Sequence, residues 1–356
     1  MTASPRPLLA LDLSVLETPY PSGVERQARE LFRELPHALA EYEIVGIARR
    51  PIEGIGTGRV VVSGGAWPRT VWRRRILPFL CAKMGVTHLH TPVTSLPRRL
   101  PCSASRCVHD IPWARPGASR DERRRLLRES WLARELARPI PTVFVSTATV
   151  DDFKTVVPGF TAPIETIGNG VAETFFEPAP SCLPPDLPST FVLVVGKFRP
   201  RRRPDVLARA ARRLEDQSGI VILWVGEGTQ TLGEGPLRGL GPVSDEVLRA
   251  LLADALALVA PSALEGFGIP VLEAMAAGRP VISAACDGVR AWAGDRIIEY
   301  PADDAEALAG RIRDLVAHPL DPAILRRNRT FARSLTWSRV AESYATFFRR
   351  IVATGR

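Results

Sequence analysis

The chain has 356 residues, of which 46% are hydrophobic and 24% are charged, and its formal net charge is +9. This length predicts two domains, and the apolar fraction is ordinary for globular proteins. No apolar run approaches the roughly 20 residues of a membrane span, and five cysteines without a C-x-x-C pair favour neither a disulfide framework nor a zinc site. The first thirteen residues are too short and too polar for a secretory signal, so we expect a cytoplasmic protein.

Arginine supplies most of the positive charge, and it is clustered. The clusters are residues 73–75, 123–125 and 199–203. A planar guanidinium suits phosphate oxygens, so such clusters favour specific phosphate sites over uniform polyanion binding.

Short apolar runs alternate with longer amphipathic ones in the first half of the chain, which predicts βαβ units. The expected strands are residues 8–13, 42–47, 59–62, 86–90, 107–109 and 142–145. The expected helices are residues 23–35, 70–84, 121–137 and 147–155.

A proline-rich segment then separates two series of elements. Residues 178–188 contain five prolines in eleven positions, which predicts an interdomain linker. The strands expected after it are residues 191–196, 220–225, 256–260 and 281–283, and the helices are residues 204–214, 245–253 and 270–277.

This pattern predicts an α/β protein with two doubly wound, Rossmann-like domains facing across a cleft. The expected division is an N-terminal domain over residues 1–177, a linker over 178–190 and a C-terminal domain over 191–335. Residues 336–356 are expected to form a helix that crosses back to the first domain.

The most informative stretch is PSALEGFGIPVLEAMAAGRP, residues 261–280. Gly266 and Gly268 let the backbone approach a ligand closely, and Pro270 suits the first turn of a helix. A loose turn that opens into a helix N-terminus offers free amides and a positive dipole end to an anion. Glu265 precedes the turn and Glu273 lies about one helical turn beyond it. The spacing of the two glutamates alone would be compatible with surface residues.

The full string EGFGIPVLE, placed after a strand, resembles the E-x7-E region of retaining GT-B glycosyltransferases, especially glycosyltransferase family 4. The resemblance implies that Glu265 contacts the hydroxyls of the donor sugar and that Glu273 holds the ribose of the nucleotide. It also implies that the backbone amides of four residues meet the sugar and diphosphate. These residues are Gly266, Phe267, Gly268 and Ile269.

Two further strings in the second half resemble the same family. GKFRPRRRP, residues 196–204, is similar to a string whose basic residues grip the donor diphosphate, which implies that role for Arg201 and Arg202. A solvated basic turn is the alternative. GLGPVSDE, residues 239–246, is similar to the loop that brackets the nucleotide base, which places Val243 beside the base; the same loop can cap a helix through Ser244.

The first half carries weaker similarities. PSGVER, residues 21–26, resembles the family's glycine loop near the donor phosphates, which implies a role for Gly23. VHDIP, residues 108–112, resembles its H-D strand end, where the histidine lies close to the donor sugar and the acceptor. His109 takes that position, and a buried structural histidine is the alternative.

The resemblance implies a hexosyltransferase that moves a sugar from a nucleotide-diphosphate donor to a glycan, lipid-linked or small-molecule acceptor. No D-x-D pair is placed for a metal, so Arg201 and Arg202 are expected to neutralise the leaving diphosphate, with no metal and no cofactor. The resemblance also implies that transfer retains the anomeric configuration, with Glu265, His109 and the two arginines as the catalytic set. One departure stands out: Ala291 replaces a glutamate that the family often carries, which puts donor contacts there in doubt.

Other functions stay open. The same fold would suit a phosphorylase or a nucleotide-sugar epimerase, and the charge would suit a non-enzymatic polyanion-binding protein, although no basic stripe interleaved with aromatics indicates nucleic acid. Residues 72–80, WRRRILPFL, mix basic and apolar side chains. This segment could touch an anionic inner membrane face, and a solvated amphipathic helix explains it equally well.

Overall fold

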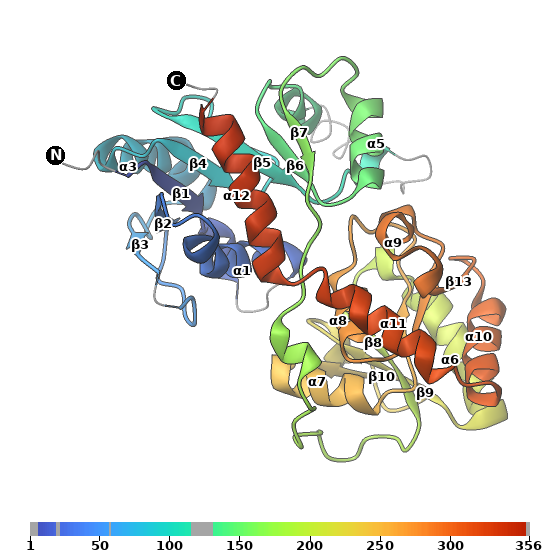
Figure 1. Cartoon of the computed structure of the whole chain (residues 1–356). Coiled ribbons are helices and arrows are strands. Elements are labelled where there is room, and N and C mark those ends of the chain that lie inside the picture. Colours follow the sequence, from blue (N-terminus) through green and yellow to red (C-terminus); the bar gives the residue numbers. More distant parts are fainter. Residues whose placement is uncertain (1–5, 19–21, 57, 115–130, 354–356) are drawn as a thin grey trace. The chain divides into compact units, whose positions relative to one another are not determined.

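The structure is a computed structural model that describes residues 6–18, 22–56, 58–114 and 131–353 (Figure 1). Contacts divide the chain into two compact units. Unit 1 comprises residues 1–169 and 337–356, and unit 2 comprises residues 170–336. The expected boundary after residue 177 therefore differs from the observed one, which lies between Asn169 and Gly170.

Unit 1 is built on a seven-stranded parallel sheet with the order β3-β2-β1-β4-β5-β6-β7. Its strands are β1 (Leu8–Asp12), β2 (Glu43–Ala48), β3 (Val60–Val62), β4 (His88–Thr91), β5 (Ser103–Val108), β6 (Thr142–Phe144) and β7 (Ile164–Thr166). The strand order reverses between β1 and β4, which is the topological switch point where ligands bind in such sheets.

The helices of unit 1 follow the strands as the sequence pattern predicts. They include α1 (Gly23–Ala38), α2 (Arg69–Val71), α3 (Leu77–Met84), α5 (Thr147–Val156) and α12 (Trp337–Ala353). The helix expected over residues 121–137 lies mostly outside the described residues, as does the arginine cluster at 123–125; residues 131–136 are helical. Helix α12 packs along α1, so the last helix of the chain is part of unit 1 (Figure 1).

The helix expected over residues 70–84 contains a wide turn. Residues Trp72–Ile76 form a π-helical turn between α2 and α3. Pro78 lies in the first turn of α3 and has no amide hydrogen to donate to the preceding turn, which accounts for the irregularity. Trp72 is fully buried, whereas Arg74 and Arg75 are exposed.

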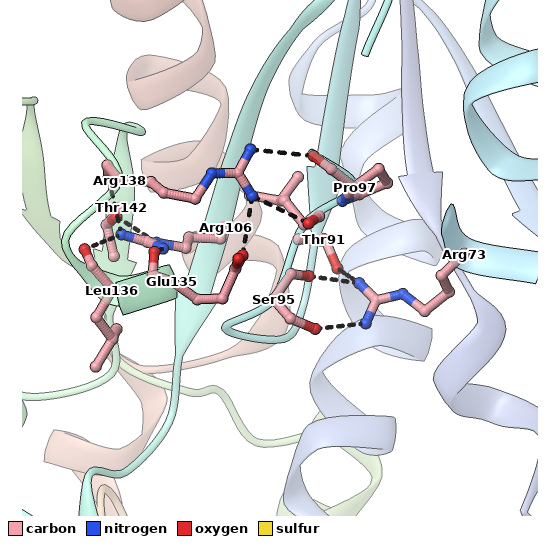
Figure 2. Close-up of polar contacts among 10 residues, drawn as sticks. Arg73, Thr91, Ser95, Pro97, Arg106, Glu135, Leu136, Arg138 and Thr142 are labelled. Atoms are coloured by element: carbon pink, nitrogen blue, oxygen red, sulfur yellow. Dashed lines mark hydrogen bonds and ion pairs between the residues drawn. The ribbon is translucent and has the colours of Figure 1, made fainter. Parts of the chain in front are cut away.

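A fully buried arginine ties the segment before β6 to the sheet (Figure 2). Arg106 in β5 donates to Thr142 Oγ1 at 2.9 Å and to the carbonyls of Glu135, Leu136 and Arg138. Burial lowers the pKa of Arg106 to about 10. Carbonyl acceptors around the whole guanidinium offset the cost of burying this charge.

Unit 2 is a six-stranded parallel sheet with the order β10-β9-β8-β11-β12-β13. Its strands are β8 (Phe191–Val195), β9 (Val221–Val225), β10 (Leu237–Gly241), β11 (Leu258–Ala260), β12 (Val281–Ala284) and β13 (Ile298–Tyr300). Here the order reverses between β8 and β11. Two parallel sheets with reversed strand order confirm the doubly wound α/β prediction for both halves of the chain.

The helices of unit 2 cover this sheet. They are α6 (Pro204–Ser218), α7 (Asp245–Asp254), α8 (Ile269–Ala276), α9 (Asp287–Ala293), α10 (Ala305–Ala317) and α11 (Pro322–Arg333). The main core lies between the sheet and the neighbouring helices α6 and α10, which both contribute rows of buried aliphatic side chains.

The proline-rich segment is held against unit 2 by two arginines. Arg249 donates to the carbonyl of Pro178 at 3.0 Å, and Arg238 donates to that of Asp186 at 2.6 Å. These contacts explain why residues 178–190 belong to unit 2. No helix in the described part of the chain is both long and apolar enough to cross a membrane.

Candidate functional site

Two turns meet at the switch point of unit 2. One follows β8 and carries Arg201 and Arg202, and the other follows β11 and carries Glu265. Arg202 Nη2 lies 3.5 Å from Glu265 Oε1, and Arg201 Nη2 lies 4.0 Å from Glu265 Oε2. The structure thus brings together three of the side chains that the sequence predicted for the site.

Glycine shapes the turn after β8. Gly196 has a φ of +132°, and a Cβ there would lie 2.4 Å from the Arg202 guanidinium. The absence of a side chain lets Arg202 fold back and donate to the Val195 carbonyl at 3.0 Å. Trp224 donates to the Gly196 carbonyl at 2.8 Å, which fixes the turn to the neighbouring strand β9. The guanidinium is therefore held in one orientation.

The backbone at Glu265 is fixed by the start of α9. The amide of Glu265 donates to Cys286 Sγ at 3.2 Å. Gly288 lies so close that a Cβ there would be 1.7 Å from the Glu265 carbonyl oxygen. A glycine at position 288 is therefore required if Glu265 is to keep this place, which the sequence analysis did not identify.

The segment Gly266–Ile269 leads into α8 and is anchored by stacking. Phe267 is 4% exposed and stacks on Trp292, with ring centroids 4.7 Å apart and an interplanar angle of 11°. Trp292 Nε1 also donates to the Phe267 carbonyl at 2.8 Å. Gly268, with a φ of +86°, is the N-cap of α8. Ala291, which replaces the glutamate of the resembling family, is exposed one residue before this tryptophan.

The charges of the site are only partly neutralised by one another. The side chains of Arg202 and Glu265 are each 15% exposed, and that of Arg201 is 39% exposed. Burial lowers the pKa of Arg202, with Glu265 opposing that shift. Glu265 Oε1 is buried and has no hydrogen-bond partner among the described residues. Two guanidinium groups and a helix N-terminus on neighbouring turns are groups that favour an anion, and the role of these residues in binding stays a prediction.

The two remaining residues predicted in unit 2 lie in α8 and in the loop between β10 and α7. Glu273 is one turn into α8 and 3% exposed. Val243 is half-buried in the loop between β10 and α7, two strands away from β8. Ser244 caps α7, since its hydroxyl accepts from the amide of Val247 at 3.3 Å. The capping interpretation of that loop is confirmed, and the role of Val243 stays a prediction.

Unit 1 holds the other two predicted residues. Gly23 is the exposed first residue of α1, where Ser22 and Glu25 form a capping box. His109 follows β5 directly, is half-buried, and has its Nε2 3.2 Å from the Pro92 carbonyl. Burial lowers the pKa of His109, but Cys107, Asp110 and the Pro92 carbonyl outweigh it, and the net shift is upward.

A buried ion pair at the switch point of unit 1 was not predicted from the sequence. Asp12 is the last residue of β1, and its Oδ2 accepts from Arg73 Nε at 3.0 Å. The sequence placed Arg73 in an arginine cluster suited to phosphate, whereas its side chain is only 13% exposed and is paired with Asp12. A carboxylate at the end of an apolar strand was the signal that pointed to this pair.

Lys197 was a second omission, because it lies in the predicted basic string but received no role. Its Nζ lies 2.8 Å from Glu227 Oε2 in the turn after β9.

For metals, no group of three or more His, Cys, Asp or Glu side chains that could hold an ion occurs within the described ranges.

Comparisons with known proteins agree with this architecture. Residues 189–318 match the model of the family Glycosyl transferases group 1. D-inositol 3-phosphate glycosyltransferase of Mycolicibacterium paratuberculosis is 28% identical over 54% of this chain and 48% of that protein. O-antigen chain mannosyltransferase B of Escherichia coli is 37% identical over 32% of this chain and 28% of that protein. The match thus spans less than half the length of either relative.

Solved structures resemble the chain over nearly its whole length. Sucrose-phosphate synthase of Thermosynechococcus elongatus has a TM-score of 0.77 and 20% identity, covering 98% of this chain and 100% of that chain. Anabaena HepE in complex with UDP-glucose has a TM-score of 0.72 and 17% identity, covering 96% of this chain and 99% of that chain. The chain therefore has the GT-B fold, and its residues 189–318 are similar to the glycosyl transferases group 1 family.

Proposed function

We propose that the protein is a glycosyltransferase that moves a hexose from a nucleotide-diphosphate sugar to an acceptor hydroxyl. The meeting of Arg201 and Arg202 with Glu265 at the switch point of unit 2 carries this proposal. Arginine forks suit diphosphate oxygens, and the glutamate offers an acceptor for sugar hydroxyls. The named relatives are glycosyltransferases, and one structural neighbour was solved with UDP-glucose.

In this proposal negative charge develops on the leaving diphosphate as the bond from the anomeric carbon to the phosphate oxygen breaks. Arg201, Arg202 and the amides of Gly266–Ile269, all in unit 2, stabilise that charge. Two fixed guanidinium groups supply positive charge that a metal ion provides in other enzymes. We therefore propose metal-independent transfer, which full activity in the presence of EDTA would support and a strict requirement for Mg²⁺ or Mn²⁺ would contradict.

We further propose that transfer retains the anomeric configuration. Glu265 and Glu273 lie in one loop–helix segment and do not form the opposed carboxylate pair of hydrolases. The donor phosphate takes the proton of the acceptor hydroxyl, and His109 contacts the donor sugar and the acceptor. An NMR assignment of the anomer in the first-formed product tests retention, because an inverted product would exclude it.

The donor class is tested by thermal shift with UDP-, GDP-, TDP- and ADP-sugars. A ligand that binds only the folded state adds about 2.7 kcal/mol of stability at one hundred times its dissociation constant. At least one of the four should raise the melting temperature of the wild type and leave that of Arg202→Ala unchanged. If none of them stabilised the wild-type protein, the proposed donor class would be wrong.

We also propose that unit 1 contacts an anionic membrane face that presents a lipid-linked acceptor. The exposed side of residues 66–84 combines a phenylalanine and a tryptophan with four basic residues: Trp67, Arg69, Arg74, Arg75, Phe79 and Lys83. Phe79 is 60% exposed and Trp67 is 49% exposed, which suits insertion beside anionic headgroups. Sedimentation with phosphatidylglycerol vesicles at low salt should capture the wild type and release the Phe79→Ser variant. Failure of the wild type to sediment would remove the proposal.

A further inference from the structure

The loop that follows β4 is closed by a single side chain. Arg73 Nη2 donates to Thr91 Oγ1 at 2.9 Å and to the Ser95 carbonyl at 2.7 Å, and Arg73 Nη1 donates to Ser95 Oγ at 3.0 Å. Thr91 and Ser95 are the two ends of a five-residue loop, so the guanidinium holds both ends at once (Figure 2).

Arg73 is itself held in place by the sheet. Its Nε donates to Asp12 Oδ2, which also accepts from the Thr91 hydroxyl at 3.3 Å. The other oxygen, Asp12 Oδ1, accepts from the amide of Ser14 at 3.0 Å. A lysine at this position could not span the loop, because its ammonium is a point charge whereas the guanidinium is a rigid fork.

The loop presents one carbonyl to His109. Pro92 directly follows Thr91, its φ is fixed by its ring, and its carbonyl oxygen lies 3.2 Å from His109 Nε2. A carbonyl can only accept, so Nε2 carries the proton and Nδ1 is the basic nitrogen of the neutral ring. Cys107, whose thiol is hydrogen-bonded to the ring, and Asp110 also face this imidazole, and His90 lies nearby.

We propose that Arg73 is a positioning residue for sugar transfer, which acts through the Pro92 carbonyl to fix the tautomer of His109. This inference rests on the proposed function only in that His109 is taken to contact the reacting sugar and acceptor. The two tautomers present opposite hydrogen-bonding character at each ring nitrogen, so a mixed tautomer state would offer a bound group the required donor or acceptor in only part of the population.

The tautomer can be measured without any activity. In the protein labelled with ¹⁵N-histidine, long-range ¹H–¹⁵N spectra distinguish the two ring nitrogens, and the His109→Gln variant assigns the signal among the five histidines. The wild type should show the Nε2–H form. Arg73→Lys should show a mixed tautomer state and a lower pKa of His109, because the bond to Pro92 raises that pKa. Arg74→Lys, an exposed neighbour, is the matched control and should leave both unchanged.

The transfer rate of Arg73→Lys should fall by about 10- to 100-fold, since a displacement of about 1 Å in a catalytic group costs on the order of 10²-fold. If Arg73→Lys does not fold, the milder Ser95→Ala variant removes one hydrogen bond of the fork and should shift the His109 signals in the same direction. Unchanged His109 signals in a folded variant would overturn the inference, even if the rate fell. Shifted signals together with full transfer by His109→Ala would uphold the link from Arg73 to His109 and contradict the proposed role of His109 in transfer.

Discussion

Each unit places arginine at its switch point, and the arginines differ in how they contact a neighbouring carboxylate and in how far Arg201 is exposed. In unit 1, Arg73 makes hydrogen bonds to Asp12, Thr91 and Ser95, and its side chain is 13% exposed. In unit 2, the Arg201 side chain is 39% exposed, and Arg202 meets Glu265 at 3.5 Å, beyond the usual hydrogen-bond distance.

This difference separates structural from ligand-binding charge. The guanidinium of Arg73 is committed to the fold, so its removal should damage unit 1. In unit 2, Gly196 leaves room for the Arg202 guanidinium, and Cys286 and Gly288 fix the backbone at Glu265. Charges held in place in this way are suited to a ligand. If the two arginine sites differ in this way, substitutions in unit 1 should lower stability and substitutions in unit 2 should lower the transfer rate.

The largest effect on stability is expected from Arg73→Ala. It leaves the buried carboxylate of Asp12 without its ion-pair partner, and breaking such a pair costs about 3–5 kcal/mol. Chemical denaturation should show this loss, whereas the exposed Arg74→Ala should stay within about 0.5 kcal/mol of the wild type. Equal stabilities of the two variants would remove the structural assignment of Arg73.

Arg201→Ala should lower the transfer rate without lowering the stability of the fold. We expect the transfer rate to fall about 10²–10³-fold, as for the loss of one transition-state donor, with an unchanged melting temperature. The Glu265→Ala variant should likewise abolish transfer without unfolding the chain. Arg212→Ala, which removes an exposed charge from α6, serves as the control. A variant of Arg201 or Glu265 with near-normal rates would show that the site is misassigned.

Acid should destabilise unit 1 more than unit 2. Burial lowers the pKa values of His88 and His90 to about 3, far below the unfolded value near 6.5. The unfolded chain therefore binds more protons between these values, and stability falls as the pH drops below 6.5, by about 1.4 kcal/mol per pH unit for each histidine. Hydrogen exchange at pH 7 and pH 5.5 should show faster exchange in β4 and α12 at the lower pH. Equal protection at both values would contradict the sign of the effect.

The smallest effect is expected from Trp292→Phe. It keeps the stacking on Phe267 but removes the hydrogen bond from Nε1 to the Phe267 carbonyl, at a cost of about 1 kcal/mol. The melting temperature should fall only slightly. The affinity for the donor should fall clearly, because the loop that carries Glu265 becomes more mobile. Calorimetric titration with the donor identified above measures this difference, and unaltered affinity would remove the supporting role of Trp292.

Features with a local cause were predictable from the sequence. The strand preceding Glu265, the helix that starts after Gly268 and the cap at Ser244 follow from periodicity, glycine and capping chemistry. Short strands with few apolar residues were missed: β7 and β10 have no fully apolar run, and β13 contains Glu299. Their pairing with neighbours, which the local sequence does not reveal, makes them strands.

Features that depend on distant contacts were not predictable. Gly288 matters because its backbone touches Glu265, twenty-three positions earlier, and Arg73 is buried because Asp12 lies at the end of a strand remote in sequence. The arginine cluster at residues 73–75 contains both Arg73, whose side chain is largely buried, and Arg74, which is exposed. Only the three-dimensional arrangement distinguishes a structural arginine from a surface one.

The most direct test is a crystal structure of the protein with a nucleoside diphosphate, using the base that the thermal-shift panel selects. The diphosphate should lie within hydrogen-bonding distance of the Arg201 and Arg202 guanidinium groups and of the amides of Gly266–Ile269. A well-ordered nucleotide bound elsewhere, with these groups unchanged, would contradict the assignment of the unit 2 switch point as the donor site.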